Sequence, residues 1–168
     1  MKVFKEEQRF TQLWLIVLIA LSIMVPIGIM VKEFSKENTS LTTNQFVLTL
    51  LGILASALFI FTFKLTTRID EKGIYYQFFP FHFKLKLISW SMVSKAYVRI
   101  YDPIGEYGGW GLKGGALWNK NKGKAINVSG DIGIQLELKT GKKLLIGTQK
   151  KEEANRVLET YKSKIEKR

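Results

Sequence analysis

Two long stretches near the start of the chain are almost continuously apolar. Residues 13–31 and 46–63 number nineteen and eighteen, and neither stretch contains a charged residue. At about 1.5 Å per residue, each helix would span about 27–28 Å, close to the hydrocarbon core of a bilayer. A domain of the remaining size could not cover two helices that are apolar on all sides. The pattern predicts two transmembrane spans, at 13–31 and 46–63.

A cleaved signal peptide is the alternative for the first stretch. Against it, the apolar run is longer than a typical signal core, no small-x-small site precedes Lys32, and a second apolar run follows. Pro26 and Gly28 are tolerated in a membrane helix. We therefore expect residues 1–64 to form a membrane hairpin.

The charges that flank the two stretches predict the orientation of this hairpin. Residues 32–40 form a short connection, which places both ends of the hairpin on one side of the membrane. Basic residues flank the hairpin on that side: Lys2, Lys5, Arg9, Lys64 and Arg68. By the positive-inside rule, the protein is a multi-pass protein of the cytoplasmic (inner) membrane with both termini cytoplasmic.

After residue 64 the apolar period changes to two, which is typical of strands. Two strands are expected at 65–69 and 74–79, joined by a turn at 70–73. A third alternates from Phe81 to Leu87. Its expected core residues are Phe81, Phe83, Leu85 and Leu87, and its outward residues are His82, Lys84 and Lys86.

Four further strands complete a predicted set of about seven antiparallel strands. The fourth is expected to turn Ala96, Val98 and Ile100 inward, and Lys95, Tyr97, Arg99 and Tyr101 outward. The other three are expected at 124–128, 132–138 and 143–146.

The apolar period becomes helical again at the C-terminus. Ala154, Val157, Leu158, Tyr161 and Ile165 share one face of an amphipathic helix predicted at about 149–166, with Thr148 as its N-cap. The fold class is an α+β membrane protein, in which a transmembrane hairpin precedes a domain of strands and one helix at residues 65–168. Seven strands followed by one helix is the pattern of a pleckstrin-homology-like (PH-like) barrel.

The order of these parts resembles bacterial membrane proteins with an N-terminal transmembrane hairpin and a cytoplasmic PH-like domain. The segment Ser89-Trp90-Ser91-Met92-Val93 is similar to a short motif of that family, although Ser89 stands where proline is frequent and Met92 where an acid is common. The resemblance covers most of the chain. It implies membrane residence and binding or scaffolding rather than a reaction.

Composition and charge narrow the chemistry. The net charge is +12, and residues 64–168 hold 21 basic and 10 acidic residues, a net +11. A basic domain beside a bilayer favours anionic lipid headgroups over nucleic acid as a partner. The chain has no cysteine and one histidine, which excludes disulfides, thiolate sites and an all-histidine metal centre. We expect no catalytic, cofactor-binding or metal-binding residues, and no cofactor.

Three segments carry candidate contacts to lipid or a partner. The glycine-rich residues 105–115 hold Tyr107, Trp110 and Lys113, and are expected mainly as a folded excursion between strands. The second segment is a basic turn with Trp118, Lys120, Lys122 and Lys124. The third is an aromatic tip around Phe79, with Lys84 and Lys86, that would rest in the membrane interface.

Three functional hypotheses follow. The leading one is a non-enzymatic, membrane-anchored module that binds anionic lipid, a protein partner or a second copy of itself. The second is a small-molecule sensor or enzyme that uses the 105–115 loop. The third is a structural subunit of a larger membrane complex, in which small side chains allow close helix packing: Gly28, Gly52, Ala55, Ser56 and Ala57.

Overall fold

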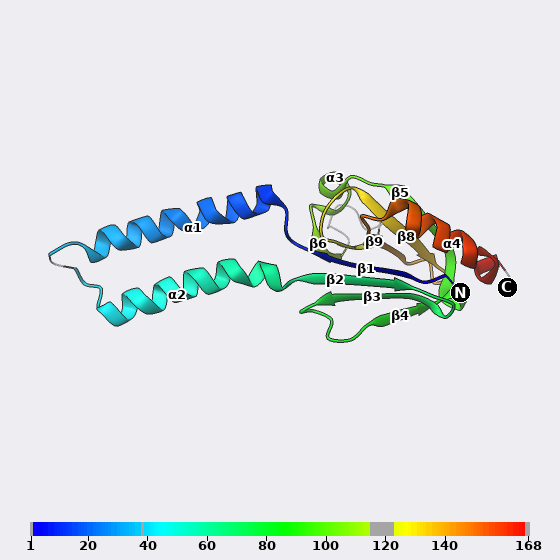
Figure 1. The fold of residues 1–168 in the computed structure, drawn as a ribbon, viewed down its shortest axis with the longest axis horizontal. Helices are drawn as coiled ribbons and strands as arrows, with labels where there is room; N and C mark the ends of the chain where they lie inside the picture. The colour runs from blue at the N-terminus through cyan, green and yellow to red at the C-terminus, as the bar shows by residue number, and fades with distance from the viewer. Residues whose placement is uncertain (1, 38, 115–122, 167–168) are drawn as a thin grey trace. The chain divides into compact units, whose positions relative to one another are not determined.

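A computed structural model of the 168-residue chain describes residues 2–37, 39–114 and 123–166. The chain divides into two compact units. One consists of residues 10–63, and the other combines residues 1–9 with residues 64–168. The smaller unit is helical, and the larger unit is a mostly antiparallel β domain with a C-terminal helix (Figure 1).

The smaller unit is a pair of apolar helices. They are α1 (Leu13–Phe34) and α2 (Thr43–Phe59), which continues into the 3-10 helix η1 (Ile60–Thr62). Both are long and apolar enough to cross a membrane, which agrees with the two predicted stretches. Met30 is the single buried residue in α1, and α2 has none. The described chain therefore leaves most of their apolar surface uncovered.

The larger unit contains two sheets (Figure 1). The first has the order β1-β2-β3-β4, and all its pairs are antiparallel. Its strands are β1 (Phe4–Arg9), β2 (Lys64–Ile69), β3 (Gly73–Phe79) and β4 (Lys86–Ser89).

The second sheet has the order β5-β8-β9-β7-β6. The β7–β9 pair is parallel, whereas the prediction had every strand antiparallel. The strands are β5 (Val93–Ile100), β6 (Gly111–Gly114), β7 (Lys124–Asn127), β8 (Ile132–Leu138) and β9 (Lys143–Gly147).

The first nine residues do not belong to the helical unit, in contrast to their predicted place in a hairpin of residues 1–64. β1 pairs with β2 along its whole length, from Phe4 opposite Ile69 to Arg9 opposite Lys64. The helical pair is therefore inserted between two neighbouring strands of one sheet. Both of its chain connections begin at the same end of that sheet, because Arg9 and Lys64 are partners.

One face of β1 is tied to the end of the second sheet. Phe4 is fully buried on this face. Glu6 accepts hydrogen bonds from the Thr148 hydroxyl at 2.6 Å and the Gln149 amide at 2.7 Å. The Gln8 side chain donates to the Gly147 carbonyl at 2.8 Å. The first strand therefore helps to hold the two sheets together.

Replacing Glu6 with Ala is expected to destabilise the β domain by about 2–4 kcal/mol. The Thr148 hydroxyl and the Gln149 amide would both lose the buried carboxylate that accepts their hydrogen bonds. Glu7→Ala is the matched control. Glu7 lies on the opposite face and forms a partly exposed 3.6 Å ion pair with Lys64, which is worth about 0–1 kcal/mol. Chemical unfolding of both full-length variants measures the difference. Equal destabilisation would show that the buried contacts of Glu6 do not stabilise the domain.

The C-terminal helix α4 (Lys151–Glu166) buries the predicted apolar face. Ala154, Val157, Leu158 and Tyr161 are buried, and Ile165 is half-buried. Tyr161 stacks on Trp90 with ring centroids 5.4 Å apart. Trp90 belongs to the 3-10 helix η2 (Trp90–Met92), which connects the two sheets, so this contact joins α4 to their connection.

The predicted third strand is wrong over most of its length. Only its end is strand, in β4, and its four expected core residues are 45–79% exposed: Phe81, Phe83, Leu85 and Leu87. In the fourth strand, Ala96 and Val98 are half-buried, but Ile100 is 64% exposed and Tyr101 is buried. Tyr101 follows the last residue of β5, where strand alternation no longer sets the side-chain direction.

Candidate functional site

The end of β3, the connection after it and the start of β4 form an exposed aromatic tip, residues 79–87. Phe79 is 36% exposed, Phe81 60% and Phe83 79%. The Phe79 and Phe83 rings meet edge to face at 6.1 Å, and Phe81 stacks on the buried Phe78 at 6.0 Å. An exposed apolar surface of this kind marks an interaction site more often than a free surface. Sequence alternation had assigned Phe81 and Phe83 to the core, whereas Phe79 was predicted as a contact residue.

Hydrogen bonds connect the first part of the tip to the end of β3. The His82 amide donates to the Phe78 carbonyl at 2.8 Å, and the Gln77 side chain donates to the His82 carbonyl at 3.1 Å. The Phe78 amide donates to His82 Nδ1 at 3.3 Å. Partial burial and, second, the charge of Lys86 lower the pKa of His82. The ring is therefore neutral near pH 7, and the positive charge of the tip comes from its lysines.

Lys84 and Lys86 are exposed on the same segment, in agreement with their predicted outward direction. The tip thus combines aromatic rings and cations without a carboxylate in its sequence. This is the composition of segments that lie in the headgroup region, where aromatic rings reach the acyl boundary and lysines meet phosphates.

The register of the first sheet fixes which end of the sheet carries the tip. Phe79 is the partner of Lys64, which is the partner of Arg9. The tip therefore starts at the same end of the sheet as both connections to the helical unit. The turn around Lys72 lies at the opposite end of β2 and β3.

The glycine-rich segment is folded by its own contacts. Its first part is the short helix α3 (Pro103–Tyr107), which Asp102 caps by accepting from two backbone amides. Gly108 ends the helix in the left-handed region, with φ 70°, which favours glycine. Trp110 is half-buried, and its indole donates to the Gly130 carbonyl at 2.9 Å. These contacts agree with the expected folded excursion.

Polar side chains in and next to this segment have structural partners. The Arg99 guanidinium donates to both Glu106 oxygens, at 2.9 and 2.7 Å, and to the Tyr107 hydroxyl at 3.3 Å. Tyr107 is 2% exposed, so its ring is closed to a ligand, in contrast to its prediction as a contact residue. Burial raises the pKa of Tyr101 to about 12, and its hydroxyl accepts from Asn127 at 2.8 Å.

Two of the remaining predicted contacts lie on paired strands of the second sheet. Lys113 is half-buried on β6, opposite Ala125, and Lys124 is exposed on β7, opposite Gly114. Trp118, Lys120 and Lys122 lie outside the described residues. Lys124 lines a cavity together with Lys86, so the two sheets bring together basic residues that are 38 positions apart.

Among the described residues, no three His, Asp or Glu side chains are grouped so that they could hold a metal ion.

Comparison with known proteins adds no family to this description. The chain matches no protein-family model and no curated protein sequence. The geometry of the domain is therefore the basis for the functional conclusion.

Proposed function

We propose that this protein is a non-enzymatic binding module anchored in the cytoplasmic membrane. In this proposal, α1 and α2 span the bilayer, and the β domain is a PH-like domain at the cytoplasmic face. The aromatic tip engages anionic lipid there. The two sheets and the C-terminal helix support the PH-like assignment, and the two apolar helices support the anchor.

The observation that carries the proposal is the register Arg9–Lys64–Phe79. If the helices cross a membrane, both of their cytoplasmic ends continue directly into neighbouring strands. Neighbouring strands lie about 4.8 Å apart, so the base of the tip is within about 10 Å of both chain entries. The exposed phenylalanines and lysines of the tip therefore lie at the end of the sheet where the chain enters from both helices.

The same pairing requires β1 and the C-terminal domain to share one side of the membrane. The excess of basic residues in that domain favours the cytoplasmic side. Attraction of exposed lysines to anionic lipid contributes about 1 kcal/mol per residue near the surface. Lys84 and Lys86 would therefore add to the apolar contacts of Phe81 and Phe83.

The depth of the tip can be measured with a spin label, because the chain has no native cysteine. Full-length Phe83→Cys and Lys72→Cys proteins are labelled and reconstituted in vesicles that contain phosphatidylglycerol. We expect the label at residue 83 to collide mainly with oxygen, as in the acyl region. The label at residue 72, at the other end of the sheet, should collide mainly with a water-soluble nickel chelate. A label at residue 83 that is as exposed to nickel as residue 72 would contradict the proposal.

A further inference from the structure

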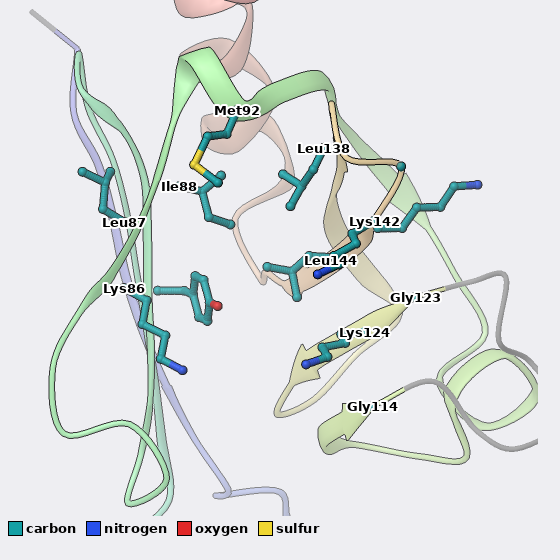
Figure 2. A pocket seen from close by; sticks show the side chains of 13 residues that line it. Lys86, Leu87, Ile88, Met92, Gly114, Gly123, Lys124, Leu138, Lys142 and Leu144 are labelled. Atoms are coloured by element: carbon teal, nitrogen blue, oxygen red, sulfur yellow. The ribbon is translucent and has the colours of Figure 1, made fainter.

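A cavity of about 1110 Å³ lies in the β domain, bordered by β3 and β4 of the first sheet and by the second sheet (Figure 2). Small-molecule sites in proteins are typically about 300–1,000 Å³, so this space is large enough for a flexible ligand. The expected folded role of the glycine-rich segment does not account for it, and of the exposed tip only Lys86 and Leu87 border it.

The interior of the cavity is apolar. The side chains of Ile88, Met92, Leu138 and Leu144 converge on it from β4, η2, β8 and β9 (Figure 2). Ile88 and Leu144 are each 7% exposed, whereas Met92 is 48% exposed, so the space opens to solvent on one side. Water forms few hydrogen bonds with such a lining. Replacement of that water by an apolar chain would therefore be favourable in free energy.

The polar residues around the cavity carry one sign of charge. Lys86 on β4 and Lys124 on β7 lie on opposite sides of the space (Figure 2). Lys142 and Lys143 also belong to its border, although Lys142 points away from the interior (Figure 2). None of the described lining residues is acidic. Ammonium groups on facing walls repel each other, and an anion between them would relieve that repulsion.

A hydroxyl group accompanies these cations. Tyr76 lines the cavity and is the cross-strand partner of Lys86. Burial raises the pKa of its phenol, so the group remains protonated at neutral pH and able to donate a hydrogen bond. The described lining thus offers an apolar interior, cations from both sheets and a neutral donor.

We propose that the cavity binds one acyl chain with an anionic head, the chain among Ile88, Met92, Leu138 and Leu144 and the head near Lys86 and Lys124. This inference names a ligand class for the binding module and so rests on the proposed function. The same chemistry is present in a free fatty acid and in the tail and head of an anionic phospholipid. An uncharged chain would fill the apolar space but leave the lysines unneutralised.

The test uses the full chain in nanodiscs of phosphatidylcholine, with a fatty acid that carries a photoreactive diazirine on its chain. After irradiation, mass spectrometry maps the labelled residues. We expect label on the two segments 88–92 and 138–144. Excess oleate or excess phosphatidylglycerol should prevent this labelling. Competition by oleate would indicate a free fatty acid as the ligand, and competition by phosphatidylglycerol an anionic phospholipid. Oleyl alcohol, of the same length without charge, should compete much less.

Charge variants give a matched comparison. Lys86→Gln and Lys124→Gln should each weaken labelling about fivefold, the equivalent of one well-placed lysine near an anion. Lys95→Gln and Lys139→Gln remove the same charge from exposed positions that do not line the cavity, and should leave labelling unchanged. Circular dichroism verifies that each variant is folded.

Four results would overturn the inference. They are label outside the cavity, competition by neither oleate nor phosphatidylglycerol, equal competition by oleyl alcohol, and equal effects of the two pairs of variants. The spin-label experiment separates this result from a failure of the proposed function. If the label at residue 83 is in water while photolabelling of the cavity persists, the docked tip is wrong and the ligand site stands. The opposite combination removes only the ligand site.

Discussion

Replacing Phe4 with Ala is expected to destabilise the β domain by about 3–5 kcal/mol, the range for loss of a buried aromatic ring. Phe4 is fully buried at the start of β1, opposite Ile69, which is also fully buried. A loss of this size should lower the midpoint of thermal unfolding by at least about 10 °C in a domain of this size. The effect is large because residues ahead of the apolar helices complete a sheet that otherwise forms after them.

Lys5→Ala is the matched control for Phe4. Lys5 is exposed on the other face of β1, and its backbone carbonyl, which the substitution retains, accepts from Lys150. The control should change stability by no more than about 0.5 kcal/mol. Near-ultraviolet circular dichroism of the full-length proteins in mild detergent follows the transition. A Phe4→Ala protein that unfolds with the control would show that β1 is dispensable for the domain.

Replacing Trp90 with Ala is expected to have a similar cost, about 3–5 kcal/mol. The indole is 4% exposed and stacks on Tyr161 of α4. Its Nε1 also donates to the Asp70 carbonyl at 2.9 Å. The substitution therefore removes both the packing of the C-terminal helix and a bond to the β2–β3 turn.

Trp90→Phe separates these two contributions. Phe retains an aromatic ring against Tyr161 but leaves the Asp70 carbonyl without its donor, so we expect a smaller loss, about 1–3 kcal/mol. Ser91→Ala, an exposed position in the same 3-10 helix, should stay within about 0.5 kcal/mol of the parent protein. Denaturant titration ranks the three variants. If Trp90→Ala is no less stable than Ser91→Ala, the contact with α4 does not hold the helix.

The elements with a strong local pattern were predictable from sequence. The two apolar helices are recognisable because every turn carries apolar side chains. The strand β8 was predicted at its observed bounds, 132–138. The C-terminal helix was also predicted, because Ala154, Val157, Leu158 and Tyr161 recur at helical spacing and are all buried. In each case the signal lies within the element itself.

β1 was missed because its pairing has no local signal. Its six residues, FKEEQR, include three charges on exposed positions and one buried carboxylate, Glu6. A buried glutamate is tolerated there because Thr148 and Gln149 satisfy it from a distant part of the chain. Its strand partner begins at Lys64, beyond two helices. Sequence reasoning had no means of connecting these segments.

The tip was misassigned for the opposite reason, since its sequence alternates like a half-buried strand. Phe81, Phe83 and Leu85 are separated by His82 and Lys84, but this segment precedes β4 and has no strand of its own. Alternation shows that a segment has one apolar and one polar face. It does not show whether the apolar face packs in the core or contacts another surface. The cavity also had no sequence signal, because its walls come from elements far apart in the chain.

The central claim is that a membrane hairpin is inserted between β1 and β2, so that both ends of the hairpin return to one domain in the cytoplasm. Single cysteines at Lys2, Ser40 and Ser91 test it directly, because all three positions are exposed and the chain has no other cysteine. The reagent is a membrane-impermeant maleimide, applied to sealed right-side-out vesicles. We predict that it labels Ser40→Cys at once, and that Lys2→Cys and Ser91→Cys react only after the vesicles are opened. Labelling of Lys2→Cys or Ser91→Cys in sealed vesicles, or protection of Ser40→Cys, would contradict the account.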